Sequence, residues 1–212
     1  MMSSRTYSTL YMLPCLAFTS VVATAATAGD QRYAIDRMDA FAQCVVRGNP
    51  DPVRDLLDTP VKSQNEHALL LKLSDKRANC IGRAGKLRMN YQNMRGALAQ
   101  QLYRRDFQTT GTMTANPKAE FTGRVDFDPI MEYGVCVALR NSPDADALLR
   151  TDSNSADEKQ ALGNLSATLA SCLATGQTIR LSPIILRGAV AEALYHQRKG
   201  DRFAYVSKEA SH

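Results

Sequence analysis

The chain has 212 residues and a net charge of +5, with 44% hydrophobic and 22% charged residues. Beyond residue 28 no run approaches the 18 apolar residues of a membrane-spanning helix, and basic residues are not interleaved with aromatic ones as in nucleic-acid binders. We therefore expect neither a transmembrane segment in that part nor a nucleic-acid partner. The remaining length supports one sizeable hydrophobic core or two small ones.

Residues 1–28 are typical of a secretory signal peptide. Arg5 gives a positive start, residues 10–22 are mostly apolar, and Ala26-Thr27-Ala28 forms a small-x-small cleavage site. A retained membrane anchor is the alternative, which Pro14 and the many Thr and Ala residues disfavour. We expect export to the periplasm or outside the cell, with Cys15 lost together with the signal.

The rest of the chain contains an internal repeat. Residues 41–103 align with residues 133–195 at an offset of 92 without gaps, and 20 of the 63 positions are identical. The pattern predicts an all-α protein of two tandem units of about four helices each, packed around a pseudo-two-fold axis. The expected parts are a signal peptide (1–28), a first helical repeat (29–105), a linker (106–128), a second helical repeat (129–197) and a flexible tail (198–212).

Each unit is expected to open with two helices. Apolar residues recur at three- and four-residue steps over residues 33–47 and again over residues 130–137, which is typical of a helix. A short second helix is predicted after Asn49-Pro50 and after Asn141-Ser142-Pro143, because a capping residue before a proline is a common helix start.

The third helix of each unit is predicted to start with a capping box. Ser63 with Glu66, and Ser155 with Glu158, have the spacing at which both side chains bond backbone N–H groups of the first turn. We interpret the two glutamates as caps; the alternative is a pair of catalytic acids. The helix is expected to continue to the second cysteine of each unit and to end at glycines.

A fourth helix is predicted after Asn90 and after Ser182. It contains Gly96 in the first copy and Gly188 in the second, although glycine in a helix costs about 1 kcal/mol relative to alanine. We expect the close approach of another helix to offset this cost. A small-residue groove that admits a ligand is the alternative.

Two arginines recur at equivalent positions, Arg88 with Arg180 and Arg95 with Arg187. A guanidinium presents a planar fork of donors that can hold a carboxylate or phosphate ligand. The alternative is that each binds carbonyls at the end of the third helix or an acid on a neighbouring helix. We favour this structural role, because a contact required by a duplicated fold would recur in both copies.

Four cysteines follow the signal, an even number in an exported chain, which favours two disulfides over free thiols or metal ligands. No Cys-x-x-Cys pair exists and only three histidines are present, so we expect no metal site. Proximity in sequence favours pairing within each unit, Cys44 with Cys80 and Cys136 with Cys172. Both pairings between the units are symmetric as well and stay open.

Two segments resemble those of known proteins: the Cys-Val pairs that begin at Cys44 and Cys136, and Leu-Arg-Gly-Ala-Val-Ala-Glu-Ala-Leu-Tyr at residues 186–195. In these the chain is similar to a group of small, uncharacterised exported proteins of alphaproteobacteria. The resemblance covers most of the chain after the signal. It implies export and brings no activity with it.

A positive face is predicted between residues 72 and 88. The first copy is strongly basic there with only Asp75 opposing, whereas residues 164–180 keep only Arg180. The fold therefore does not require this charge, and we expect an anionic envelope component such as a lipid head group or acidic polymer to bind it. The alternative is solvated side chains that complement the negative end of the third helix. The candidate residues are Lys72, Lys76, Arg77, Arg83, Lys86 and Arg88.

No catalytic motif accompanies these features. The chain has no Gly-x-Ser-x-Gly, no phosphate-binding Gly-x-x-x-x-Gly-Lys and no His-Glu-x-x-His. We expect an exported, non-enzymatic binding or structural protein that uses no cofactor. An envelope-associated hydrolase with an unrecognised site is the alternative.

Overall fold

The computed structural model describes residues 28–76, 78–81, 90–111, 128–173, 176, 178–179 and 181–200. These residues form ten helices and no strand, which confirms the predicted all-α class. The helices are α1 (Ala28–Gly48), α2 (Asp51–Leu57), α3 (Gln64–Lys76), α4 (Ala78–Ile81), α5 (Tyr91–Phe107), α6 (Pro129–Arg140), α7 (Ser142–Arg150), α8 (Ala156–Asn164), α9 (Ser166–Ser171) and α10 (Pro183–Lys199).

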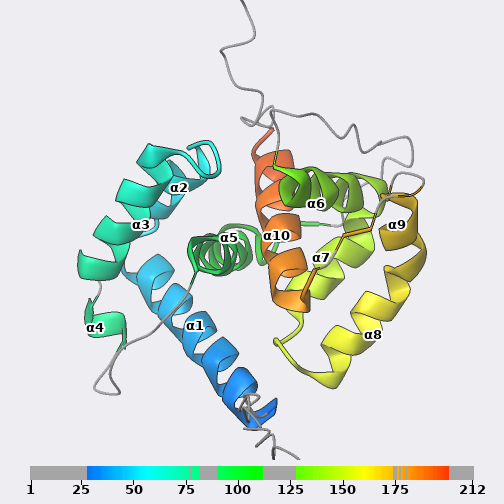
Figure 1. Ribbon diagram of the computed structural model, residues 1–212, viewed down its shortest axis with the longest axis horizontal. Helices are drawn as coiled ribbons and strands as arrows, with labels where there is room; N and C mark the ends of the chain where they lie inside the picture. Colours follow the sequence, from blue (N-terminus) through cyan, green and yellow to red (C-terminus); the bar gives the residue numbers. More distant parts are fainter. Residues whose placement is uncertain are drawn as a thin grey trace, which may run out of the picture.

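Helices α5 and α10 form the centre of the molecule. They make the most extensive contact between any two described helices. In Figure 1, α1 to α4 lie on one side of this central pair and α6 to α9 lie on the other. Residues 91–107 and 183–199 thus join the two ends of the chain in one body.

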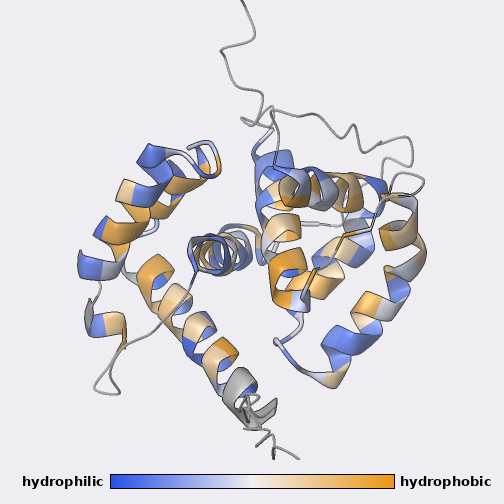
Figure 2. Ribbon diagram, in the orientation of Figure 1, coloured by the Kyte–Doolittle hydropathy of each residue, from blue (hydrophilic) through white to orange (hydrophobic). Residues whose placement is uncertain are grey.

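One hydrophobic core extends through both sides of the molecule. The largest cluster of buried apolar side chains draws residues from α1, α2, α3, α5, α6, α7, α8 and α10. Apolar surfaces of the outer helices face the central pair in Figure 2. Burying one Leu side chain stabilises a fold by about 1.5–3 kcal/mol. Because the buried side chains on both sides belong to one cluster, they form one sizeable core.

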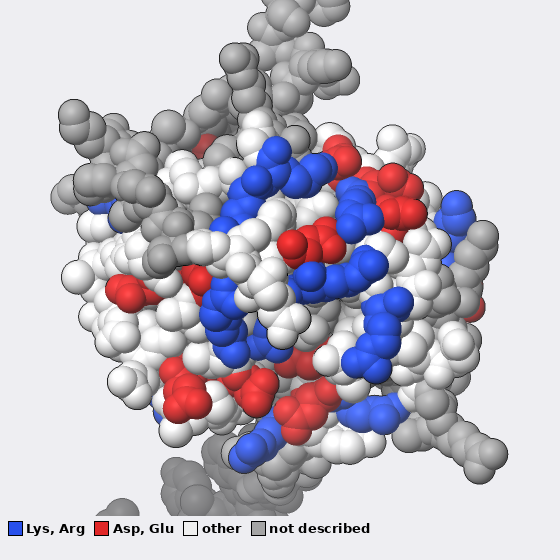
Figure 3. All heavy atoms as spheres, turned by 180° about the vertical axis from the view of Figure 1, so that it is seen from behind, with Lys and Arg blue, Asp and Glu red and all other residues white. Residues whose placement is uncertain are grey.

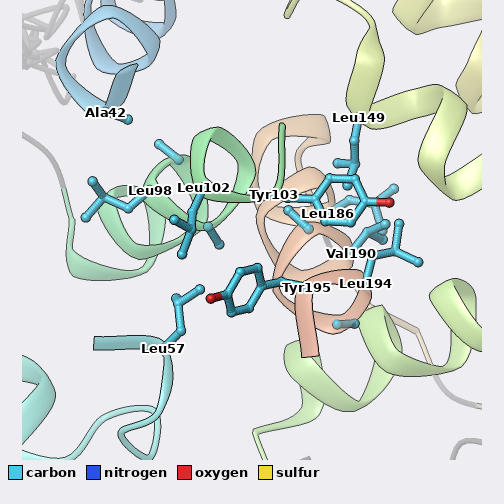
Figure 4. Packing of buried hydrophobic residues seen from close by; sticks show 14 of the residues in the cluster. Ala42, Leu57, Leu98, Leu102, Tyr103, Leu149, Leu186, Val190, Leu194 and Tyr195 are labelled. Carbon is cyan, nitrogen blue, oxygen red and sulfur yellow. The ribbon is translucent and has the colours of Figure 1, made fainter. Parts of the chain in front are cut away.

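Two tyrosines extend this core from the central helices into the outer ones. Tyr103 of α5 points towards Leu149 of α7, and Tyr195 of α10 points towards Leu57 of α2 (Figure 4). Both tyrosines are 1% exposed. Each central helix therefore packs against a short helix from the other end of the chain.

Gly96 and Gly188 lie at the crossing of α5 and α10. A Cβ atom added to Gly96 would lie 2.7 Å from the Cα of Gly188, closer than Cβ atoms come to other non-hydrogen atoms in folded proteins. The expected close contact of helices is confirmed, and it excludes a ligand from the space between these two glycines. A second close approach joins Gly134 of α6 to Ala189 of α10.

The predicted caps are present at most helix starts. The Ser63 and Ser155 hydroxyls accept hydrogen bonds from the N–H of Glu66 and Glu158, at 3.1 and 3.0 Å. Asn90 caps α5 by accepting from the Asn93 N–H at 2.7 Å. Local sequence thus determines where these helices begin.

In the first half of the chain, only Arg77, which lies outside the described residues, separates α3, which ends at Lys76, from α4, which begins at Ala78. In the second half, the expectation of one continuous third helix is wrong, because α8 ends at Asn164 before α9 begins at Ser166. This interruption lies at Leu165, between Gly163 and Ser166. Small residues of this kind are common at helix kinks, and the kink lets Leu165 be fully buried.

Both predicted disulfides are present. Cys44 of α1 is bonded to Cys80 of α4, and Cys136 of α6 to Cys172 at the end of α9. The Cα–Cα distances are 5.6 and 5.9 Å, and each pair closes a sequence separation of 36 residues. In each half the first helix is therefore tied to the end of the third predicted helix.

Several expectations fall outside the described residues. They are the signal segment up to residue 27, residues 112–127 of the predicted linker, and the tail from residue 201. Two boundaries differ from the expected ones, because α5 extends to Phe107 and α10 to Lys199. Helix α10 then ends at Gly200, whose φ of +74° is the left-handed conformation that glycine adopts readily.

Candidate anion-binding site

Arg95 lies in the core, where it is 2% exposed. Its guanidinium donates to both carboxylate oxygens of Glu192 and, at 3.1 Å, to Glu66. It also donates to the carbonyl oxygens of Leu57 and Thr59, at 3.2 and 3.0 Å. Every part of the guanidinium is occupied, so Arg95 holds helices together and is not available to a ligand.

Arg187 has the corresponding environment in the second half of the chain. It donates to Glu158 at 3.0 Å, to the carbonyl of Thr151 at 2.7 Å and to the side chain of Gln100 at 3.2 Å. Burial lowers the pKa of Arg187 from its ordinary value, while Glu158 opposes that shift. The predicted contact with an acid on a neighbouring helix is confirmed for Arg95 and Arg187. The carbonyls that they bind lie at and after the ends of α2 and α7, not at the end of the third predicted helix.

Glu66 and Glu158 have a second role beside capping. One oxygen of Glu66 accepts from the Lys62 N–H, and one oxygen of Glu158 accepts from the Asn154 N–H. The other oxygen of Glu66 pairs with Arg95, and the other oxygen of Glu158 pairs with Arg187. These glutamates are caps and also counter-ions, which leaves neither of them available as a catalytic acid.

A groove of about 540 Å³ opens where α1, α5 and α7 meet. In the described part of the chain, four arginines line it and no Asp or Glu does. On the face of the molecule opposite to Figure 1, Lys and Arg side chains gather around the centre, with acidic side chains between them (Figure 3). The lining residues of the groove are Gln43, Val46, Arg47, Gln101, Tyr103, Arg104, Arg105, Phe107, Gln108 and Arg150.

Two of the four arginines are held by the protein. Arg104 donates to the carbonyl oxygens of Leu149, at 2.6 Å, and Thr151, and burial lowers its pKa. Arg150 donates to both carboxylate oxygens of Asp146, an interaction that raises its pKa. The charge of Arg150 is thus balanced within the protein, and Arg104 serves mainly to fix α5 against the end of α7.

The other two arginines are exposed and have no partner among the described residues. Arg47 projects from the last turn of α1 and Arg105 from the last turn of α5. Neither forms a salt bridge or side-chain hydrogen bond with any residue in the described part of the chain. Two full positive charges on adjacent helices therefore face the groove without a counter-ion from the described residues, which is a favourable arrangement for an anion.

Gln101 adds a polar group to the groove. The residue is only 7% exposed and its side-chain amide makes no hydrogen bond with any described residue, yet neither amide atom is among the fully buried polar atoms that lack a partner. The amide therefore reaches the groove, where water or a ligand can bond it. The position therefore offers both a donor and an acceptor to an occupant.

At an offset of 92 residues, other residue types stand opposite these polar groups. Opposite Arg47, Arg104, Arg105 and Arg150 stand Leu139, His196, Gln197 and Asp58, and opposite Gln101 stands Ala193. None of the four arginines therefore has an arginine or lysine at the corresponding position. These mismatches are the sequence signal that points to the groove, and the predicted positive face did not include any of them.

The structure places few of the residues of the predicted positive face. The Lys72 side chain is exposed on α3, and Lys76 is the last residue of that helix. Arg77, Arg83, Lys86 and Arg88 lie outside the described residues. Binding by this face stays a prediction, and Lys72 does not line the groove.

Comparisons with known proteins add no assignment. The chain matches no protein-family model, no curated protein and no solved structure. Within the residues that the structure covers, no helix is long and apolar enough to cross a membrane. No group of three or more His, Cys, Asp or Glu residues there could hold a metal ion.

Proposed function

We propose that this protein is an exported, non-enzymatic binding protein that holds an anion in the groove lined by Arg47, Arg104, Arg105 and Arg150. One observation carries the proposal: Arg47 and Arg105 face a cavity without an acidic partner among the described residues. Ligand pockets of small molecules have volumes of about 300–1,000 Å³, a range that includes this groove.

The groove offers no strong general base. Its polar side chains are arginines, glutamines and Tyr103, and burial, followed by the hydrogen bond to Asp146, raises the pKa of that phenol. General acid–base catalysis needs a group that titrates near the working pH. Binding without turnover is therefore favoured over the alternative, an envelope-associated hydrolase.

We further infer that the fold arose by duplication of one helical unit. Arg54 pairs with Asp106 at 2.9 Å, and 92 residues later Asp146 pairs with Arg198 at 3.6 Å. The two ion pairs occupy aligned positions with their charges exchanged. The same ion pair is thus present in both halves although its two charges have changed places. This supports a common origin of the two halves, as does the recurrence of the disulfides and buried arginines.

Export is the third part of the proposal. The two disulfides are compatible with an oxidising compartment, and the N-terminal residues have the pattern of a secretory signal. Mass spectrometry of the protein recovered from the periplasm or medium tests this. A mature N-terminus at Gly29 is expected; a protein that stays inside the cell with both cysteine pairs reduced would contradict export.

A thermal-shift screen tests anion binding. Because ligands that bind the folded state raise the melting temperature, phosphate, sulfate and citrate at fixed ionic strength should stabilise the purified protein. The shift should disappear in the double variant Arg47→Leu/Arg105→Gln, which carries the residues of the second copy, and persist in the control Lys159→Gln. Equal shifts in all three proteins would overturn the groove as the site.

A second experiment tests the predicted positive face around Lys72. Anionic and neutral vesicles are compared at two salt concentrations, with a variant in which Lys72, Arg83 and Lys86 are changed to glutamate. Salt-sensitive binding that this variant loses, and the groove variant keeps, would assign membrane association to the predicted face. Hydrolysis of ester or glycoside substrates, lost in the groove variant, would instead favour the hydrolase.

A further inference from the structure

The groove is lined by more kinds of side chain than anion binding alone requires. Besides the two unpaired arginines it carries three glutamines, Gln43, Gln101 and Gln108, and an apolar wall that includes Val46 and Phe107. A simple inorganic anion would engage the guanidinium groups and leave the glutamines and the wall unused.

The glutamines indicate a hydroxylated ligand. A side-chain amide offers an acceptor oxygen and two donor hydrogens, and a hydroxyl group can both donate and accept, so hydrogen bonds can form between them in either direction. Gln101 is the strongest case, because it lines the groove, makes no hydrogen bond with the described residues and stands at the position that Ala193 occupies in the other copy.

The apolar wall is already fixed in place. The ring of Phe107 contacts those of Tyr103 and Tyr195, with centroids 5.4 and 5.8 Å apart. Arg198 lies 5.6 Å from the centroid of Phe107 and donates to the Tyr103 hydroxyl. A wall held in this way can accept the C–H surface of a ligand without first having to become ordered.

The charge indicates a phosphate. Arg47 and Arg105 supply two positive charges that no described residue balances, and a phosphate monoester carries about −1.5 to −2 charges near neutral pH. Guanidinium groups bind phosphate oxygens through paired hydrogen bonds. A carboxylate supplies only one charge to the same two groups.

From this combination we propose that the groove binds a small phosphorylated sugar or polyol, with the phosphate between Arg47 and Arg105, hydroxyls on Gln101 and C–H surface against Phe107. The proposal rests on the proposed function, because it specifies the ligand of the same site. The volume of about 540 Å³ accommodates a single sugar phosphate.

Isothermal titration calorimetry with four probes tests the assignment. Glucose 6-phosphate carries both features, inorganic phosphate lacks the hydroxylated ring, glucuronate carries one charge, and glucose carries none. Glucose 6-phosphate should bind about tenfold or more tightly than inorganic phosphate and glucuronate, and glucose should not bind measurably.

Variants assign each part of the ligand to a residue. Arg47→Leu and Arg105→Gln should each weaken inorganic phosphate and glucose 6-phosphate by about tenfold or more. Gln101→Ala should weaken glucose 6-phosphate and leave inorganic phosphate unchanged. Lys159→Gln is the control for charge outside the groove, and Arg47→Gln replaces Arg47→Leu should the leucine variant fail to fold.

The outcomes separate the two proposals. Equal affinities for glucose 6-phosphate and inorganic phosphate, with no effect of Gln101→Ala, would overturn the sugar phosphate and leave anion binding intact. Binding of an acidic polysaccharide or anionic vesicles alone, lost on Arg47→Leu, would also overturn it. Failure of every anion to bind the parent protein would overturn the proposed function itself.

Discussion

Gly96 and Gly188 touch through their backbones at the crossing of α5 and α10. A Cβ on Gly188 would lie 2.6 Å from the Cα of Gly96, and a Cβ on Gly96 would lie 2.7 Å from the Cα of Gly188. No flexible side chain is available to move aside. The distance between α5 and α10 is therefore set by the hydrogen atoms that the two glycines carry in place of side chains. The contacts around the crossing depend on this distance.

Gly188→Ala should lower the free energy of unfolding by about 1–3 kcal/mol, because overpacking the crossing outweighs the roughly 1 kcal/mol that alanine adds to helix propensity. Gly163→Ala in α8 is the matched control, since a Cβ there meets no atom within 4 Å. It should raise stability slightly. Urea unfolding of both variants checks the prediction, and a Gly188→Ala protein as stable as the parent would contradict it.

Arg95→Met should destabilise the protein by about 3–5 kcal/mol, because it leaves the buried carboxylates of Glu66 and Glu192 without their counter-ion. Adding Glu192→Gln, the residue found at the aligned position Gln100, should restore part of the loss. A double-mutant cycle in urea measures the coupling. Additive effects of the two changes would show that Arg95 and Glu192 do not depend on each other.

The two disulfides should differ in accessibility. Cys136 and Cys172 are 1% and 0% exposed, whereas Cys44 and Cys80 are only partly buried. Because a thiolate must reach the sulfur that it attacks, mild reduction followed by alkylation should label Cys44 and Cys80 first. Peptide mapping by mass spectrometry reads out the order; earlier labelling of Cys136 and Cys172 would refute it.

Loss of either disulfide should also be costly. Each closes a loop of 36 residues, which on the chain-entropy model contributes about 4 kcal/mol to stability. The double-serine variants Cys44→Ser/Cys80→Ser and Cys136→Ser/Cys172→Ser should both melt well below the parent. Calorimetry checks this, and a variant that keeps the melting temperature of the parent would show that its disulfide does not stabilise the fold.

Stability should fall above about pH 10. Burial raises the pKa values of the Tyr103, Tyr133 and Tyr195 phenols above the ordinary 10.0, so the folded state keeps protons that the unfolded state loses. The stabilisation is fully present below pH 10 and is lost as the pH rises through the folded pKa values. Each phenol contributes a slope of about 1.4 kcal/mol per pH unit in this window.

Tyr133→Phe provides the control for this alkaline loss. The Tyr133 hydroxyl donates only to the carbonyl of Leu169 among the described residues, at 2.8 Å, and takes no part in the ion pairs around Tyr103. The variant should show a shallower fall of unfolding free energy between pH 9 and pH 11. A slope identical to that of the parent would exclude Tyr133 from the effect.

Local sequence patterns predicted those features that depend on residues close together in the chain. The Ser-x-x-Glu spacing of Ser63 and Glu66 predicted a helix start, since both groups lie within one turn. The disulfides Cys44–Cys80 and Cys136–Cys172 followed from proximity within each unit. Gly96 was predicted to lie at a helix contact because its energetic cost within a helix requires compensation.

Only the tertiary structure decided which distant side chains meet. At an offset of 92 residues, Arg54 stands opposite Asp146 and Asp106 stands opposite Arg198, so neither position matches. Each half nevertheless contains an ion pair between these positions, with the charges exchanged. Likewise, Arg95 reaches Glu192 because the glycine crossing brings α5 and α10 together. Contacts of this kind depend on the relative placement of whole helices, which no local spacing specifies.

The groove also depends on the relative placement of whole helices. Arg47, Arg105 and Arg150 are far apart in sequence and belong to three helices, so their charges converge only after α1, α5 and α7 pack. The sequence by itself determined helix type, helix starts and the cysteine pairs, through interactions within one unit. The tertiary structure decided which charges are neutralised in the core and which remain free at the groove, because that depends on distances set by the packed core.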